Sequence, residues 1–364
     1  MSRLLINGVH LNVEVVGSGP AVMALHGFAG NMSTWSALVG EMKEEYTFIL
    51  VDLLGHGASD CPAEASRYAL DRAAADLACL LDCLKIRRAC WLGYSMGGRL
   101  ALVAAAMVPD RIASLIVEGA SAGLADRGGR EERAESDAAL ARFIEEKGIG
   151  PFVEFWEALP LFATQSSLPR DTRDFVRQQR LGCDPRGLAN TLRAASPGVQ
   201  PPVYARLRSL AFPVLCVAGE LDKKFSAIAR EMCGVLPDGR LAVIPGAGHC
   251  AHLERPHGAQ FSQAGSTMGL RFNRTESLKL REGRRISPNC SEYFSGDQEE
   301  GRGRACPRPR GARARLRTSD YRQHGSWHRP IGRSRERASR GSLVLRPRPP
   351  EADRAPRSFR RNLG

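Results

Sequence analysis

The sequence predicts an α/β fold, with a mostly parallel central sheet and helices on both of its faces. Short β-rich runs alternate with helical patterns over residues 1–120, and the strand pattern returns after residue 208. Alternation of this kind is typical of parallel sheets. With 43% hydrophobic and 25% charged residues, the 364-residue chain has the composition of an ordinary globular protein.

The strands and helices of this core follow in order along the chain. Runs rich in β-branched and aliphatic residues predict strands at residues 11–16, 21–25, 47–51, 90–92 and 112–117, and again at 213–218 and 240–244. Apolar residues at helical spacing predict a helix over residues 68–84. Small and aliphatic residues over 99–107 predict a second helix, packed on the sheet.

Residues 121–208 interrupt the core without a strand pattern. Charged helical segments dominate here, and glycine and proline residues break them. Because the sheet resumes afterwards, this segment is expected to be a helical cap inserted above the sheet. The predicted organisation is therefore a core formed by residues 1–120 and 209–262, a cap at 121–208 and a tail at 265–364.

The tail carries the basic charge of the chain. The formal net charge is +13, but residues 261–364 hold 25 Lys and Arg against 10 Asp and Glu, so the remainder is slightly acidic. The tail is rich in Arg, Gly, Pro and Ser and poor in aliphatic residues, which predicts disorder. Nucleic-acid binding and out-of-frame translation are the alternatives. In the tail, aromatic residues do not alternate with the basic ones in the way that base stacking requires, so no specific nucleic-acid partner is expected.

Other patterns exclude several classes of protein. No apolar run approaches the roughly 18 residues of a membrane span. The first residues, MSRLLINGVHLNVEVVG, alternate like a strand and do not resemble a signal peptide, which predicts a cytoplasmic protein. The ten cysteines show no C-x-x-C pair or zinc-ligand spacing, so no metal site is expected. Composition gives no indication of the oligomeric state.

A candidate nucleophile lies in the stretch GYSMGGR, residues 93–99. A strand that ends at Leu92, a G-x-S-x-G turn and a following helix form the layout of a nucleophile elbow, with Ser95 at its tip. The turn strains the serine backbone, and the N-terminus of the helix favours negative charge beside it. For this motif taken alone, a glycine-rich turn with an incidental serine is the alternative.

A base and an acid follow later strands. Asp222 and His249 lie in the short segments GELD and PGAGH, each after one of the two C-terminal strands, at the edge of the sheet where parallel strands place functional residues. A serine nucleophile needs such a base and an orienting acid. The order Ser95, Asp222, His249 is that of an α/β-hydrolase catalytic triad. Taken singly, Asp222 could cap a helix and His249 could be a buried structural residue, and His252 is expected to be structural.

The stretch LHGFAG, residues 25–30, follows another strand. Its backbone is expected to lie near the serine, and the amides of Phe28 and Met96 would then form an oxyanion hole. A simple tight turn is the alternative. The loop DLLGHGASD, residues 52–60, is expected to brace the site without taking part in the chemistry.

Arginines near the serine indicate an anionic substrate. Arg99 lies one helical turn after Ser95, and the cap carries the arginine-rich stretches REERAESD and FVRQQR. Guanidinium groups bind carboxylates in a bidentate way. For any one cap arginine, a solvated helix face is the alternative.

Five segments together resemble one family of the α/β-hydrolase superfamily: LHGFAGNMSTW, DLLGHGASD, GYSMGGRLAL, AGELDKKF and IPGAGHCAHLERP. The family is that of the 2-succinyl-6-hydroxy-2,4-cyclohexadiene-1-carboxylate synthases of menaquinone biosynthesis, and the resemblance covers residues 3–260. GYS-x-GGR and GE-x-D-x-KF, with R-x-x-R-x-x-SD in the cap, are the more specific motifs. The final amphipathic helix of the family is not matched, since HGAQFSQAGSTMG carries few aliphatic residues.

The resemblance implies an α/β-hydrolase fold and a lyase that needs no cofactor. Family members abstract a proton beside the succinyl ketone of 2-succinyl-5-enolpyruvyl-6-hydroxy-3-cyclohexene-1-carboxylate, a tricarboxylate, and eliminate pyruvate. Carried over, Ser95 with His249 and Asp222 would be the base, and the two oxyanion amides would stabilise negative charge. The residues implied in substrate binding are Tyr94, Arg99, Arg133, Trp156 and Arg180, with Arg130 as the alternative to Arg133.

Two rival functions stay open at this point. One is a serine esterase or C–C bond hydrolase that acts on a small anionic substrate through an acyl-enzyme formed on Ser95. The other is a nucleic-acid-binding or scaffold protein driven by the basic tail, which steeply salt-dependent DNA binding would reveal.

Overall fold

The structure, a computed structural model, describes residues 1–256. The last residues of the predicted core, the expected final helix in HGAQFSQAGSTMG and the predicted tail at 265–364 lie outside the described residues. Every residue predicted for the site lies inside them. Within residues 1–256, no helix is both long enough and apolar enough to cross a membrane.

A single sheet forms the centre of the molecule. Its strands are β1 (Ser2–Ile6), β2 (Val9–Gly17), β3 (Ala21–Leu25), β4 (Thr47–Val51), β5 (Ala89–Tyr94), β6 (Ile112–Glu118), β7 (Val214–Gly219) and β8 (Gly239–Ile244). They lie in the order β1-β2-β4-β3-β5-β6-β7-β8. β1 and β2 form a hairpin that pairs antiparallel with β4, and the other pairs are parallel. Because parallel strands are buried on both faces, they are nearly continuous apolar runs such as TFILV in β4.

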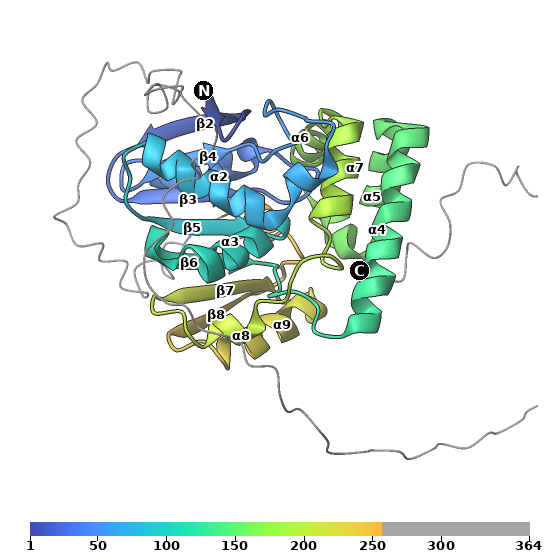
Figure 1. The fold of residues 1–364 in the computed structure, drawn as a ribbon. Helices are drawn as coiled ribbons and strands as arrows, with labels where there is room; N and C mark the ends of the chain where they lie inside the picture. The colour runs from blue at the N-terminus through green and yellow to red at the C-terminus, as the bar shows by residue number, and fades with distance from the viewer. Residues whose placement is uncertain (257–364) are drawn as a thin grey trace, which may run out of the picture. The chain divides into compact units, whose positions relative to one another are not determined.

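Helices cover both faces of this sheet. Figure 1 shows the helices of the nearer face. One face is covered by α2 (Leu70–Cys83), α3 (Met96–Met107) and α9 (Lys223–Cys233), and the other by α1 (Ser36–Met42) and α10 (Ala251–Glu254). The small residues of α3, MGGRLALVAAAM, let this helix pack closely on the strands. The predicted α/β class is confirmed.

In the sequence the cap is inserted between β6 and β7, and in Figure 1 its helices lie to one side of the sheet. It contains α4 (Arg127–Lys147), α5 (Ile149–Glu157), a 3-10 segment (Pro160–Ser167), α6 (Arg170–Leu181) and α7 (Pro185–Ala194), and α8 (Tyr204–Leu207) leads back to the sheet. The two ends of the cap are joined, since the Val203 N–H donates to the Ala122 carbonyl at 2.8 Å. The chain therefore leaves and re-enters the core at one place.

The cap has an apolar interior that continues onto the core. Phe152 and Leu188 are fully buried in it, and Ala29 from the loop after β3 belongs to the same cluster. A polar contact joins the two parts as well, since Gln179 Nε2 of α6 donates to Ser33 Oγ of the core at 2.6 Å. The cap is thus held above the loop that follows β3.

The differences between predicted and observed elements lie mainly at element ends. The pattern at residues 11–16 is the middle of β2, and its hairpin partner β1 was not separated from it. The helix expected from residue 99 begins at Met96, directly after the candidate nucleophile. β5 extends over Ala89–Tyr94 because the residues that flank 90–92 also pair with β6.

Candidate active site

Ser95 lies at the turn between β5 and α3, where its backbone adopts φ 51° and ψ −108°. Side chains avoid this region, and such strain costs about 1–3 kcal/mol. The neighbouring glycines make the turn possible, because a Cβ on Gly93 would lie 2.4 Å from Gly97 O and one on Gly97 would lie 2.3 Å from Leu25 O. The Ser95 N–H donates to the Glu118 carbonyl at 2.8 Å, which ties the turn to β6.

Three side chains meet at the carboxyl ends of β5, β7 and β8. Ser95 Oγ lies 3.1 Å from His249 Nε2, and His249 Nδ1 lies 2.7 Å from Asp222 Oδ2. A carboxylate only accepts hydrogen bonds, so Nδ1 carries the proton and Nε2 is left to accept from Ser95. With His249 only 2% exposed, these bonds lie away from bulk water. The arrangement is that of a catalytic triad.

Close packing holds the acid and the base of this triad. Asp222 Oδ1 accepts from the Phe225 N–H at 3.1 Å in the first turn of α9, which leaves Oδ2 for the histidine. Gly119 has φ +57°, and a Cβ there would lie 2.9 Å from His249 Cε1. The Phe225 ring covers the imidazole, with 4.7 Å between ring centroids. The imidazole is therefore confined between a glycine and an aromatic ring.

The loop after β3 lies against the serine. A Cβ on Gly27 would be 3.5 Å from Ser95 Cβ, and Phe28 lines the same cavity as Ser95. Met96 is the first residue of α3, where backbone N–H groups have no acceptor within the helix. The Phe28 and Met96 amides thus lie in the two segments that flank Ser95, as an oxyanion hole requires.

Buried polar residues brace this loop. His26 Nδ1 donates to Gly27 O at 2.7 Å, and its Nε2 accepts from the Leu53 N–H at 3.0 Å. Burial lowers the pKa of His26, so the ring stays neutral and can serve both bonds. Nearby, Asp52 Oδ2 accepts from the Ala58 N–H at 2.9 Å. These contacts are consistent with a supporting role for loop 52–60.

A cavity between the triad and the cap is lined by several cationic side chains. Arg99 comes from α3, Arg133 from α4, Arg180 from α6 and Lys224 from α9. Among its lining residues in the described part of the chain, Asp137 is the one acidic side chain. The lining therefore carries an excess of positive charge, which favours an anionic ligand.

Arg99 and Arg133 are positioned by polar neighbours. Arg99 Nη1 donates to Gln200 Oε1 at 2.8 Å. Arg133 Nε donates to Asp137 Oδ2 at 2.9 Å, and the Ser196 hydroxyl donates to the same oxygen at 2.6 Å. Burial and the neighbouring Arg133 lower the pKa of Arg99 to about 9. A bound carboxylate would offset both effects, because an opposite charge favours the protonated guanidinium.

An aromatic wall in the cap adjoins Arg180. The ring centroids of Trp156 and Phe162 lie 5.6 Å apart, and the Arg180 guanidinium lies 5.0 Å from the Phe162 centroid. Arg180 Nη2 donates to Gln165 Oε1 at 2.9 Å, and Nη1 lies 3.2 Å from Glu157 Oε1. The cap therefore supplies both an apolar surface and an oriented positive charge to the cavity.

Tyr94, the residue before the candidate nucleophile, lies between two histidines. Its ring centroid is 5.5 Å from that of His249 and 5.0 Å from that of His252. It lines the cavity although it is only 9% exposed. Burial raises the pKa of Tyr94 well above its usual range, so the phenol stays protonated and can donate a hydrogen bond.

The structure brings the predicted site residues together. Ser95, His249 and Asp222 form one hydrogen-bonded chain. The two residues predicted for the oxyanion hole and all five predicted for substrate binding line the cavity. It also separates the two arginines that the sequence left as alternatives. Arg133 lines the cavity, whereas the Arg130 guanidinium donates to the backbone carbonyls of Leu124 and Ala125.

Lys224 and Gln165 are among the polar residues of the cavity that were not predicted. Lys224 lies two residues after Asp222 in AGELDKKF, so the family motif already contained it. Burial and the neighbouring Arg133 lower the pKa of Lys224, which is consistent with a place among other cations. Gln165 lies in the 3-10 segment of the cap, where no sequence pattern indicated a site residue.

Comparisons with known proteins agree with this geometry. Residues 20–256 match the family model described as alpha/beta hydrolase fold. A curated protein of Bacillus subtilis (strain 168), a putative 2-succinyl-6-hydroxy-2,4-cyclohexadiene-1-carboxylate synthase, is 42% identical over 236 residues, which cover 65% of this chain and 86% of the relative. The 2-succinyl-6-hydroxy-2,4-cyclohexadiene-1-carboxylate synthase of Enterobacter sp. (strain 638) is 37% identical over 238 residues, with 65% and 87% covered.

Two solved structures are similar to this fold. MenH from S. aureus superposes with a TM-score of 0.68 at 31% identity, covering 72% of this chain and 98% of that one. A thermophilic esterase from Thermogutta terrifontis with malate bound has a TM-score of 0.65 at 27% identity, covering 74% and 97%. The chain is thus similar both to synthases and to an esterase.

Proposed function

Because the chain belongs to the α/β-hydrolase superfamily and, within it, to the family of 2-succinyl-6-hydroxy-2,4-cyclohexadiene-1-carboxylate synthases, we propose that it is such a synthase in menaquinone biosynthesis. The proposed substrate is 2-succinyl-5-enolpyruvyl-6-hydroxy-3-cyclohexene-1-carboxylate, from which pyruvate is eliminated. One combination supports this most strongly: a hydrogen-bonded triad opens onto a cavity lined by four cationic side chains.

In the proposed mechanism Ser95 acts as a base and not as a nucleophile. As Ser95 Oγ takes the proton beside the succinyl ketone, its own proton passes to His249 Nε2, 3.1 Å away. The electron pair of the C–H bond moves into the ring, and the C–O bond to the enolpyruvyl group breaks. The proton held by His249 returns to the leaving group, which becomes pyruvate. Asp222 stabilises the transient imidazolium.

Negative charge develops on the ketone oxygen during proton abstraction. The Phe28 and Met96 amides are proposed to stabilise it, and the N-terminus of α3 adds to this effect. A polarised ketone makes the neighbouring C–H bond more acidic, so the elimination needs a positioned base and no acyl-enzyme.

The substrate carboxylates are proposed to bind the cationic side chains of the cavity. Arg99, Arg133 and Arg180 supply planar guanidinium groups that match carboxylates, while Trp156 and Tyr94 contact the ring. The core at residues 1–120 and 209–262 would then carry the chemistry, and the cap at 121–208 most of the recognition. We further propose that the protein acts in the cytoplasm and uses no organic cofactor in the elimination.

The test is to follow pyruvate release from freshly made enolpyruvyl substrate. Wild-type protein is expected to release pyruvate, and Ser95→Ala should lower kcat by roughly a thousandfold or more, as loss of one triad member does. Circular dichroism of Ser95→Ala controls for folding. Absence of release from folded wild-type protein would contradict the synthase activity.

A serine esterase is the second candidate, because the Ser95–His249 hydrogen bond is equally suited to nucleophilic attack and a 27% identical esterase shares the fold. It can be distinguished with p-nitrophenyl esters of short acids. Fast turnover with an initial burst would reveal an acyl-enzyme and favour the esterase. Slow turnover without a burst, together with pyruvate release, favours the synthase.

A further inference from the structure

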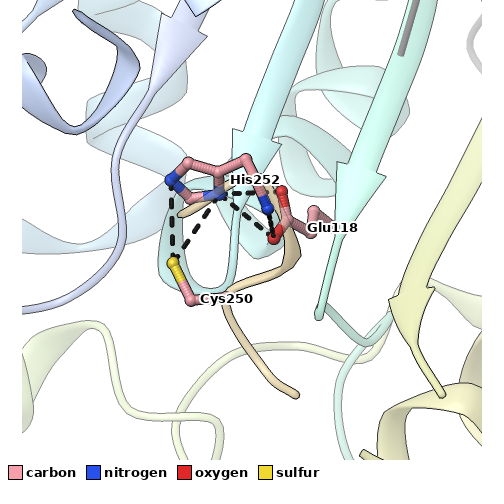
Figure 2. A group of neighbouring side chains, drawn as sticks. All are labelled: Glu118, Cys250 and His252. Atoms are coloured by element: carbon pink, nitrogen blue, oxygen red, sulfur yellow. Dashed lines mark hydrogen bonds and ion pairs between the residues drawn. The ribbon is translucent and has the colours of Figure 1, made fainter. Parts of the chain in front are cut away.

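A second polar cluster adjoins the triad and consists of Glu118, Cys250 and His252 (Figure 2). Glu118 is the last residue of β6, whereas Cys250 and His252 lie at the start of α10, shortly after His249. All three are buried, with 0%, 3% and 7% of their surface exposed. The proposed mechanism uses none of these side chains.

His252 is the centre of the cluster. Its Nδ1 lies 2.9 Å from Glu118 Oε2 and 3.7 Å from Cys250 Sγ, and its Nε2 also lies 3.7 Å from the sulfur. Nε2 lies 3.0 Å from Thr34 Oγ1. The ring stacks on Trp35 with 4.4 Å between centroids, which holds its orientation. Candidate ligand atoms of the three residues all lie within 4.8 Å of one another.

These atoms form a ligand set for a metal ion. Thiolate, imidazole and carboxylate together favour zinc and similar thiophilic divalent cations. With metal–ligand bonds of about 2.0–2.3 Å, tetrahedral ligands lie about 3.3–3.6 Å apart. The observed separations of Nδ1 from Oε2 and from Sγ, 2.9 and 3.7 Å, lie on either side of this range. Because Sγ lies equally far from Nε2, at 3.7 Å, the sulfur has to move toward the Nδ1 side of the ring before one ion can bind all three residues.

The second nitrogen and the charge balance agree with this assignment. A histidine that binds a metal usually donates its other ring N–H to a neighbouring oxygen. With the ion on Nδ1, the Nε2–H of His252 can donate to Thr34 Oγ1. Binding of a divalent ion releases two protons, one from the Cys250 thiol and one that the His252–Glu118 pair shares. The two positive charges of the ion are then balanced by one thiolate and one carboxylate. The cluster thus stays neutral, and no net charge is buried.

The cluster can be reached from the catalytic side, because Cys250 and Thr34 also line the active-site cavity. We propose that Glu118, Cys250 and His252 bind a thiophilic divalent cation of the zinc class, and that occupation of this site inhibits the enzyme. A water molecule from the cavity would complete a tetrahedral ligand set.

Inhibition follows from the backbone that this cluster shares with the triad. The Glu118 carbonyl accepts the Ser95 N–H at 2.8 Å, and Cys250 is the residue after His249. Drawing the three ligands around an ion moves both segments. The 3.1 Å contact between Ser95 and His249 then changes, and proton transfer is sensitive to such displacements.

The binding test uses full-length protein freed of metal with a chelator, and Co²⁺ as a spectroscopic probe. We expect thiolate-to-cobalt charge-transfer absorption that saturates at one equivalent and is displaced by Zn²⁺. Cys250→Ser should abolish the absorption and weaken zinc binding by more than about tenfold. Cys183→Ser removes another buried thiol, in the cap, and should change neither result. Absence of the absorption in the wild type, or its persistence in Cys250→Ser, would overturn the site.

His252→Gln tests the same site through a second ligand and should also abolish the absorption, with circular dichroism as the control for folding. Inhibition is measured as pyruvate release with added Zn²⁺, each variant compared with its own rate in chelator. Cys250→Ser should need at least about tenfold more Zn²⁺ than Cys183→Ser for equal inhibition. Equal sensitivity would overturn the inhibitory role. Since the cobalt spectrum needs no turnover, failure of the proposed activity and failure of this site are distinguishable.

Discussion

The carboxylate of Asp222 accepts two hydrogen bonds, one that caps a helix and one that orients His249. Oδ1 caps α9 through the Phe225 N–H, and Oδ2 holds Nδ1 of His249. An asparagine could still cap the helix, but it lacks the negative charge that stabilises an imidazolium. The contributions of this residue to stability and to catalysis are therefore separable.

Asp222→Asn is expected to lower kcat for pyruvate release by about 10³–10⁴-fold, with little loss of stability. Asp184→Asn is the matched control, because Asp184 caps α7 through the Arg186 and Gly187 N–H groups and lies in the cap. Both variants are compared by kcat and by thermal midpoint. A normal kcat in Asp222→Asn would exclude the triad mechanism.

Arg133 and Arg130 lie one helical turn apart on α4 and differ in what they contact. Arg133→Gln is expected to raise KM by about 10–100-fold, because a hydrogen bond to a charged group contributes about 1.5–3 kcal/mol. Arg130→Gln should stay within about twofold of the wild type, since its guanidinium meets backbone carbonyls and not the cavity. Steady-state kinetics of pyruvate release check both. Similar KM values for the two variants would contradict the assignment of Arg133.

At the scale of elements, α3 packs close to the sheet because Gly97 and Gly98 in its first turn carry no side chain. A Cβ on Gly98 would lie 2.6 Å from the Ala120 Cβ, and one on Gly97 would meet the Leu25 carbonyl. The helix therefore cannot carry larger residues here without moving away from β3. Since α3 begins at Met96, such a movement also displaces the residue beside Ser95.

Gly97→Ala is expected to destabilise the protein by about 1–3 kcal/mol, as overpacking does, and to lower activity more than stability alone explains. Gly40→Ala is the opposite case. Gly40 is exposed within α1, and its Cβ would meet open space. This variant should be stabilised by about 0.5–1 kcal/mol. Urea unfolding and kcat are the measurements, and a Gly97→Ala protein with normal values of both would disprove the close-approach argument.

Strands were easier to predict than helices, for a physical reason. Parallel strands are buried on both faces, so AVMAL and TFILV stand out as continuous apolar runs and their ends were located to the residue. Short mixed helices such as α1 (SALVGEM) give a weaker pattern and were not predicted. Asn7-Gly8 is a typical hairpin signal and forms the turn between β1 and β2, with positive φ at both residues, but the predicted strands did not include β1.

Across the whole molecule, the three residues of the predicted triad could be placed together because each lies in the turn or loop after a strand, and parallel strands end at one edge of the sheet. Gln165 could not be assigned in this way, because its place at the cavity depends on how the cap lies over the core. The Glu118–His252 pair was also invisible to sequence spacing, since 134 positions separate its members. Sites formed by a motif within one segment are therefore easier to predict from sequence than contacts between distant segments.

Removing the residues after 265 is expected to leave pyruvate release within about twofold of the full chain, because every residue assigned to the site lies within residues 1–256. The same variant should lose any steeply salt-dependent binding to DNA, because most of the excess positive charge lies beyond residue 261. Kinetics and a salt titration of DNA binding check both. Loss of folding or activity would show that the tail contributes to the enzyme.

The hydrogen bond between Val203 and Ala122 joins the two ends of the cap, so the cap is an insertion that begins and ends at one place on the core. Gly123, at φ +106°, lets the two stems touch, since a Cβ there would lie 2.9 Å from the Pro202 Cα. A different helical segment inserted between Gly123 and Pro202 would therefore start and end at neighbouring positions that are already joined. Recombination, in evolution or in protein engineering, could therefore replace the cap, and with it much of the substrate specificity, while the catalytic residues of the core stay unchanged.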